Sequence, residues 1–146
     1  MVDLLLNDEE TLLKKTVSDF SKNELAARAA GYDESTLFPW DNVSGIADLG
    51  LFGLTIPEEY GGSGGTTRQL AIAAEEIAKG CAATSVVYIA HLSLCTQFIN
   101  MFGSEEQKTK YLPDLASGKK IGAFALSEPG AGSDAAAIKT SAVRSN

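Results

Sequence analysis

Cysteine and histidine are scarce in this sequence. Its 146 residues include two cysteines, Cys81 and Cys95, and one histidine, His91. No further Cys or His stands at metal-like spacing, so we expect neither a disulfide framework nor a metal site, and two reduced thiols in the core. His91 has no Ser, Cys or Asp at an evident triad spacing, and we interpret it as a buried histidine with satisfied hydrogen bonds.

Positive charge is also scarce, because 12 Lys and Arg stand against 19 Asp and Glu, and the formal net charge is -7. This argues against nucleic acid or an anionic membrane surface as the main partner. It does not exclude anionic ligands, since backbone donors bind them regardless of net charge. The N-terminus lacks the basic region of a targeting peptide, and no apolar run approaches the roughly 20 residues of a membrane span. We therefore expect a soluble intracellular protein.

Helical periodicity dominates the chain up to about residue 119. Capping residues precede apolar positions that recur three and four residues apart, which is typical of helices with one buried face. The expected helix starts are Asn7 or Asp8, Asp41 or Asn42, Thr66 or Thr67, Ala82, and Ser104, and the expected ends are Gly31, Gly50, Gly103 and Gly118.

Two of these helices carry further expectations. The segment from Ala82 to Phe102 has almost no polar face, which predicts a place in the middle of a helical bundle. The last helix opens with a capping box at Ser104, and Pro113 within it predicts a kink or an early break.

From Ile121 the hydrophobic period changes to that of a strand. We predict strands over 121–126 and 138–143, joined through a glycine-rich turn that begins at Pro129. The predicted fold is mainly α, with a helical domain over 1–119 and the start of a β-rich domain over 120–146. Residues 130–135 match the pattern G-x-G-x-x-A, but no helix follows to receive a pyrophosphate, so we do not expect a Rossmann site. The glycines instead let the backbone approach a flat or phosphorylated ligand.

The same turn carries a resemblance to a known family. The segment Phe124-Ala-Leu-Ser-Glu-Pro-Gly-Ala-Gly-Ser-Asp134, with Ile138-Lys-Thr140 behind it, resembles the signature of the acyl-CoA dehydrogenases. Further segments resemble that family in the same order: Pro57-Glu-Glu-Tyr-Gly-Gly62, Phe102-Gly-Ser-Glu-Glu-Gln-Lys108 and Tyr111-Leu-Pro-Asp-Leu-Ala-Ser-Gly118. The resemblance covers nearly the whole chain and is closest to short-chain members.

The resemblance implies an FAD enzyme that oxidises an acyl-CoA thioester to the trans-2-enoyl-CoA. A glutamate base removes the α-proton in that family, and the cofactor accepts the β-hydrogen as hydride. Its members have an N-terminal helical domain, a β-barrel-like middle domain and a C-terminal four-helix bundle. This chain would be the helical domain with the first strands of a truncated middle domain. The C-terminal bundle, the catalytic base and most of the flavin site would then be absent from it.

The resemblance also assigns site residues. Ser133 would contact the cofactor pyrophosphate and the CoA part of the substrate. Glu128 belongs to the signature, and we do not assign it as a base. Leu94, Cys95 and Phe98 would line the acyl pocket, for which plain core packing is the alternative. The cofactor contacts implied by the family pattern are Phe124, Leu126, Ser127, Gly132 and Ser133.

The expected partners follow from the same family. They are an acyl-CoA substrate, a further copy of the chain or the remainder of a dehydrogenase, and an electron-transfer flavoprotein for the full-length enzyme. The expected location is the cytoplasm, or the mitochondrial matrix in a eukaryote. Two alternatives stay open: a non-catalytic helical module that completes a site with another polypeptide, and a related flavin oxidase.

Overall fold

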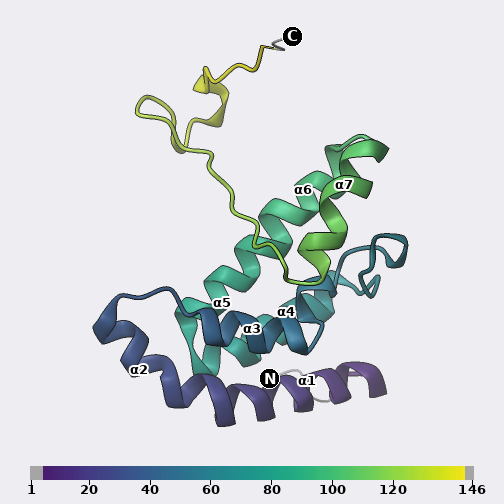
Figure 1. Ribbon diagram of the computed structural model, residues 1–146, viewed down its shortest axis with the longest axis vertical. Helices are drawn as coiled ribbons and strands as arrows, with labels where there is room; N and C mark the ends of the chain where they lie inside the picture. The colour runs from purple at the N-terminus through teal and green to yellow at the C-terminus, as the bar shows by residue number, and fades with distance from the viewer. Residues whose placement is uncertain (1–4, 144–146) are drawn as a thin grey trace.

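The computed structural model describes residues 5–143, which are mainly helical (Figure 1). The helices form one body, and the chain after α7 extends away from it. The helical elements are α1 (Asp8–Phe20), η2 (Ser21–Leu25), α2 (Ala26–Ser35), α3 (Trp40–Asp48), η3 (Leu51–Gly53), η4 (Glu58–Tyr60), α4 (Thr67–Gly80), α5 (Ala82–Ile89), η5 (Ala90–Thr96), α6 (Gln97–Phe102), α7 (Glu105–Ala116) and η6 (Ala135–Ala137).

The first helical run begins where its sequence predicts. Asn7 forms a capping box with Glu10: its side chain accepts the Glu10 backbone N–H at 2.8 Å, and Glu10 Oε2 accepts the Asn7 N–H at 3.0 Å. The predicted stop at Gly31 is wrong, because α1, η2 and α2 continue to Ser35. A glycine alone costs a helix only about 1 kcal/mol. The run ends where Thr36 takes a left-handed conformation, just ahead of Pro39.

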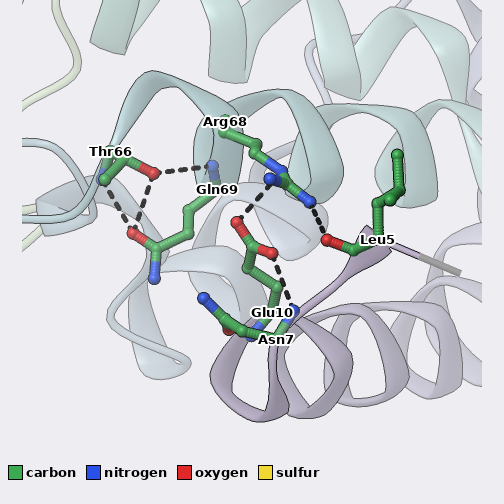
Figure 2. Close-up of polar contacts among 6 residues, drawn as sticks. All are labelled: Leu5, Asn7, Glu10, Thr66, Arg68 and Gln69. Carbon is green, nitrogen blue, oxygen red and sulfur yellow. Dashed lines mark hydrogen bonds and ion pairs between the residues drawn. The ribbon is translucent and has the colours of Figure 1, made fainter. Parts of the chain in front are cut away.

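The N-terminus of α4 lies beside that of α1, and one arginine joins them (Figure 2). Thr66, one of the two predicted start residues, forms a capping box with Gln69 at the start of α4. Arg68 pairs with Glu10 Oε1 at 3.1 Å and donates a hydrogen bond to the Leu5 backbone carbonyl. The buried Glu10 carboxylate therefore has two roles: it caps α1 and it pairs with the Arg68 guanidinium.

The core lies between α1, α3, α4, α5 and α7. A buried polar chain crosses it: Asn42 Nδ2 donates to Thr84 Oγ1 at 2.9 Å, and Thr84 Oγ1 donates to Cys81 Sγ at 3.1 Å. Cys81 is therefore a free core thiol, as predicted, whereas Cys95 is free and only half-buried. The largest fully buried apolar side chains are Tyr88, Phe52, Leu25, Ile46, Ile56, Ile77, Leu92 and Leu112.

The apolar helix, residues 82–102, is continuous through α5, η5 and α6 but is not buried on all sides. The expectation of full burial is wrong, because Val86 and Phe102 are 66% and 69% exposed. Its inward face carries polar groups that find partners, such as Ser85 Oγ, which donates to the Ala74 carbonyl at 2.9 Å. Because polar side chains lie on the buried face and apolar side chains on the exposed face, periodicity could not separate the two faces.

This helix also qualifies the expectation that no apolar run reaches membrane-span length. Ala82–Phe102 is long and apolar enough to cross a membrane by length and composition, with a mean hydropathy of 1.4 in its most apolar window. One such helix is weak support for a membrane span, because the core helix of a soluble protein passes the same test.

The last helix, α7, starts at the predicted capping box, in which Ser104 Oγ accepts the Gln107 N–H at 3.2 Å. It continues past Pro113 to Ala116, so the predicted break is absent. Pro113 lies in the last turn, where its missing N–H removes only one bond near the helix end. Gly118 follows at φ 71°, in the left-handed region that ends helices, as predicted.

The strands predicted over 121–126 and 138–143 do not form among the described residues. The bridge assigned there joins Glu128 and Ala131, the two sides of one turn. A strand needs a neighbouring strand for its backbone groups, and the described part of the chain offers these segments none. Residues 144–146 of the predicted β-rich domain lie outside the described residues.

Candidate functional site

The apolar helix and the glycine-rich segment meet at two aromatic rings. Phe98 of α6 and Phe124 have ring centroids 5.9 Å apart, inclined at 57°. Phe102 lies one helical turn beyond Phe98, with ring centroids 5.0 Å apart. Phe98 and Phe124 keep 52% and 40% of their surface exposed, so this cluster presents an open aromatic face. A residue predicted for the acyl pocket therefore contacts one predicted for the flavin.

The other predicted acyl-pocket residues lie one helical turn before Phe98. Leu94 is exposed. Cys95 is half-buried against Gly122: a Cβ placed on Gly122 would lie 2.5 Å from Cys95 Sγ. Burial raises the pKa of the Cys95 thiol, while the Ala123 backbone acts in the opposite sense. A thiol with a raised pKa is a weak nucleophile at neutral pH, so Cys95 serves as a packing surface.

The glycine-rich turn is folded by the chain itself. The Glu128 N–H donates to the Ala131 carbonyl at 2.8 Å, and the Ala131 N–H donates back at 3.1 Å. Gly130 and Gly132 have ordinary φ values, and a Cβ added at either would meet no atom within 4 Å. Nothing in the described chain occupies the space beside these two glycines. The turn is thus open for the close approach of a ligand.

Glu128 ties this turn to the segment that follows η6. Its carboxylate accepts the backbone N–H groups of Lys139 and Thr140 at 3.0 and 2.8 Å, and it also accepts the Thr140 hydroxyl. These bonds, with Thr140 foremost, hold the pKa of the carboxyl below its ordinary value. A general base is most effective with a pKa near the working pH. Glu128 is therefore suited to holding the loop and not to removing a proton.

The structure brings together only part of the predicted site. Phe124, Gly122 and the apolar helix are in contact, whereas the chain beyond Phe124 extends away from the helices (Figure 1). Leu126, Ser127, Gly132 and Ser133 are all exposed along that extension. Ser133 is thus an exposed residue of the extended segment. The candidate site is therefore one exposed surface, and the chain along it carries aromatic, hydroxyl and glycine residues.

A groove between α6 and α7 was missed by sequence reasoning. It has a volume of about 430 Å³ and continues from Phe98 along the exposed side of α6. Phe102 stands four residues after Phe98, a spacing that places both on one helix face and could have identified it. The residues that line the groove are Phe98, Ile99, Phe102, Gly103, Gln107 and Tyr111.

Known proteins share both the sequence and the arrangement of these elements. The family model for the N-terminal domain of acyl-CoA dehydrogenases matches residues 7–119. The chain is 45% identical to a short-chain specific acyl-CoA dehydrogenase of Clostridium acetobutylicum over 142 residues, which are 97% of this chain and 38% of the relative.

Solved structures give the same result. A chain in the structure of the electron transferring flavoprotein of Acidaminococcus fermentans is 36% identical, with a TM-score of 0.87 over 92% of this chain and 36% of that one. An acyl-CoA dehydrogenase of Bacillus anthracis complexed with FAD is 36% identical, with a TM-score of 0.84 over 95% of this chain and 24% of that one. The chain spans about 38% of the length of its Clostridium relative. It belongs to the acyl-CoA dehydrogenase family, whose N-terminal domain it carries.

Proposed function

We propose that this chain is the N-terminal part of an FAD-dependent acyl-CoA dehydrogenase that converts an acyl-CoA to the trans-2-enoyl-CoA. The observation that carries the proposal is the contact between Phe98 and Phe124. It joins the helix expected to line the acyl pocket to the segment expected to face the flavin. The similarity to a short-chain specific relative supports a short acyl chain.

The exposed segment fits the two halves of FAD. Phe124 and Leu126 are 40% and 46% exposed and offer apolar surface to a flat ring. The open space at Gly130 and Gly132 would admit phosphate oxygens, and the Ser127 and Ser133 hydroxyls would donate hydrogen bonds to polar edges of the cofactor. Bound FAD would supply the hydride acceptor. The Bacillus anthracis relative, which is complexed with FAD, supports this assignment.

The substrate would bind at the same exposed surface. Leu94, Cys95 and Phe98 would contact the acyl chain, and Ser133 would contact the CoA part, provided that the extended segment folds back over the helix. Such folding requires strand partners, and residues 121–126 and 138–143 have none in the described part of the chain. We therefore propose that residues 120–146 begin the middle β-rich domain and that residues 1–119 are the helical domain.

The catalytic base and most of the flavin site would come from the part of the relatives that this chain does not span. Glu128 is the acidic residue of the turn, and its carboxylate is committed to Lys139 and Thr140. We expect no dehydrogenation of butyryl-CoA by the purified, mass-verified chain with an artificial electron acceptor, and little retention of FAD through gel filtration. Turnover by that chain would contradict the proposal that it is catalytically incomplete.

A complementation experiment tests the activity itself. The chain is co-expressed with the part of the Clostridium relative that it does not cover. We expect a yellow complex that dehydrogenates butyryl-CoA, with reoxidation by an electron-transfer flavoprotein. Gly132→Val should prevent FAD binding in this complex, because its side chain would fill the open space at the turn. Gly31→Val, at a glycine that is also free of neighbours but lies in α2, is the matched control. An assembled complex that binds FAD and has no activity would overturn the proposal.

Two other candidates give different outcomes in the same experiment. A non-catalytic module that completes a site with another polypeptide is favoured by the exposed apolar face of residues 82–102. It would assemble with the second polypeptide without conferring turnover. A flavin oxidase of the same architecture would consume oxygen with butyryl-CoA and need no added acceptor.

A further inference from the structure

His91 lies at the junction of the helical body and the flavin-facing segment. It belongs to η5 and is fully buried. The centroid of its ring lies 4.6 Å from the centroid of the Phe52 ring. The backbone of Phe52 and the backbone of Leu115 face the imidazole from η3 and α7. The histidine therefore contacts two other elements of the helical body.

The imidazole holds the chain that leaves α7. Its Nδ1 atom accepts the Gly122 backbone N–H at 2.9 Å, across 31 residues of sequence. An Nδ1 that accepts carries no proton, so in the neutral ring the proton is assigned to Nε2. Nε2 has no hydrogen-bond partner among the described residues, although the backbones of Phe52 and Leu115 lie beside the imidazole. The prediction of a fully satisfied histidine is therefore correct for one nitrogen only.

The acceptor state of His91 is maintained by its surroundings. Burial lowers the pKa of the imidazole to about 4, and the backbones of Leu115 and Phe52 offset this only in part. Nδ1 is consequently available as an acceptor throughout the neutral range. A buried imidazole that stays neutral is a fixed acceptor for one backbone N–H.

Gly122 fits this position closely. A Cβ on it would lie 2.5 Å from Cys95 Sγ and 2.6 Å from Cys95 Cβ, so a larger residue fits only if Cys95 or the segment shifts. Two residues later, Phe124 contacts Phe98. His91, Cys95 and Phe98 stand four and three residues apart, on one face of the helix. The segment thus follows that face, anchored first at His91 and then at Phe98.

We propose that His91 is a positioning residue, whose hydrogen bond to Gly122 sets where the segment carrying Phe124 and Leu126 enters the flavin site. Lys120, whose N–H donates to the Asp114 carbonyl at 3.0 Å, and Ile121, which packs against the core, come before Gly122. The hydrogen bond then fixes Gly122, the next residue of an otherwise extended segment. The positions of the residues that follow depend on where Gly122 is held, and Phe124 therefore lies against Phe98. The inference rests on the proposed function only for the identity of the ligand that the segment would face.

The hydrogen bond can be measured directly in the isotopically labelled chain by NMR. We expect a scalar coupling across it between the Gly122 amide nitrogen and His91 Nδ1. Absence of this coupling at pH 7 in the folded chain would overturn the proposal without any variant. Because no flavin is needed, the result is independent of the complementation experiment, and either proposal can fail alone.

Variants test whether the bond positions Phe124. His91→Leu removes the acceptor, and the Gly122 amide should exchange with solvent on the order of tenfold faster, with loss of the Phe98–Phe124 contact. His91→Asn places an amide oxygen near the position of Nδ1 and should restore both. Gly122→Ala should break the same contact from the segment side and leave His91 in place. A Phe98–Phe124 contact that persists in a folded His91→Leu or Gly122→Ala chain would overturn the inference.

Discussion

The Tyr60 hydroxyl donates a hydrogen bond to Glu105 Oε2 at 2.8 Å, across 45 residues of sequence. Tyr60 belongs to the loop 57–62 and Glu105 to the segment 102–108, so two of the segments that resemble the family are joined in space. The bond to Glu105 raises the pKa of Tyr60 to about 12, and Lys108, followed by Tyr60, lowers the pKa of Glu105. The phenol thus stays a donor and the carboxylate an acceptor over the neutral range.

We predict that Tyr60→Phe lowers the midpoint of thermal unfolding by roughly 2–4 °C, because the carboxylate loses its donor while the buried ring is kept. Circular dichroism during heating measures this midpoint. Tyr111→Phe is the matched control, since Tyr111 is exposed and its ring, not its hydroxyl, faces Lys110. Equal shifts in the two variants would contradict a specific role for the bond between the loop and α7.

The contact between the N-termini of α1 and α4 predicts a larger loss of stability than the one expected for Tyr60→Phe. Glu10→Ala removes the capping bond to Asn7 and leaves Arg68 without its carboxylate (Figure 2). We expect a loss of about 1–2 kcal/mol in the free energy of unfolding, measured in urea. Glu9→Ala, one position earlier and exposed, should cost less than about 0.5 kcal/mol. A similar loss in both variants would show that helix-dipole charge, and not this junction, stabilises the N-terminus.

His91 predicts a dependence of stability on pH. The pKa of the imidazole falls from 6.5 to about 4 on folding, so the unfolded chain binds a proton more readily. The stability from this group is fully present above pH 6.5 and is lost as the pH falls toward 4. Between pH 7 and pH 5 we expect a loss of about 2 kcal/mol in the free energy of unfolding.

Because His91 is the only histidine, its substitution isolates this effect. The His91→Asn chain should show nearly constant stability between pH 7 and pH 5, when urea unfolding is followed at each pH. Carboxylates begin to titrate only toward the lower limit of this range. An equally steep pH dependence in His91→Asn would contradict the burial of a neutral imidazole.

Local features of the fold could be predicted from the sequence, because they depend on neighbours in the chain. The helix starts at Thr66 and Ser104 were predicted, and each residue forms a capping box with the residue three positions later, although only the box at Ser104 was itself predicted. The end of a helix depends also on the conformation of the residues beyond its last turn. Gly31 was therefore misleading, whereas Gly118, which takes a positive φ, was not.

The residues of the site could be predicted from the sequence, but the contacts between them could not. The contact between Phe98 and Phe124 and the bond between His91 and Gly122 join residues 26 and 31 positions apart, which no local pattern encodes. The predicted strand at 121–126 is not formed among the described residues for a related reason: strand propensity is expressed only when a partner strand supplies the hydrogen bonds. Residues that look apolar at 82–102 could not be assigned to an inner or an outer face by periodicity alone.

The Glu128 carboxylate gives a prediction for the glycine-rich turn. Glu128→Ala should increase hydrogen exchange at the Lys139 and Thr140 amides, because the carboxylate is their acceptor. In the unmodified chain, the pKa of Glu128 is lowered on folding, so this protection is present above pH 4.5 and is lost as the pH falls further. Glu106→Ala, at an exposed position in α7, is the control. Unchanged exchange at both amides in Glu128→Ala would show that the turn is held by other contacts.

The exposed face of the apolar helix predicts how the isolated chain behaves in solution. Val86 and Phe102 are both exposed on this helix, and large exposed apolar surface associates or binds hydrophobic dyes. We expect Val86→Gln with Phe102→Gln to reduce self-association in sedimentation velocity and to reduce dye fluorescence, with little change in unfolding temperature. Leu92→Gln, on the buried face, should instead lower that temperature markedly, because a buried amide without partners is costly. A monomeric unmodified chain that binds no hydrophobic dye would contradict this expectation.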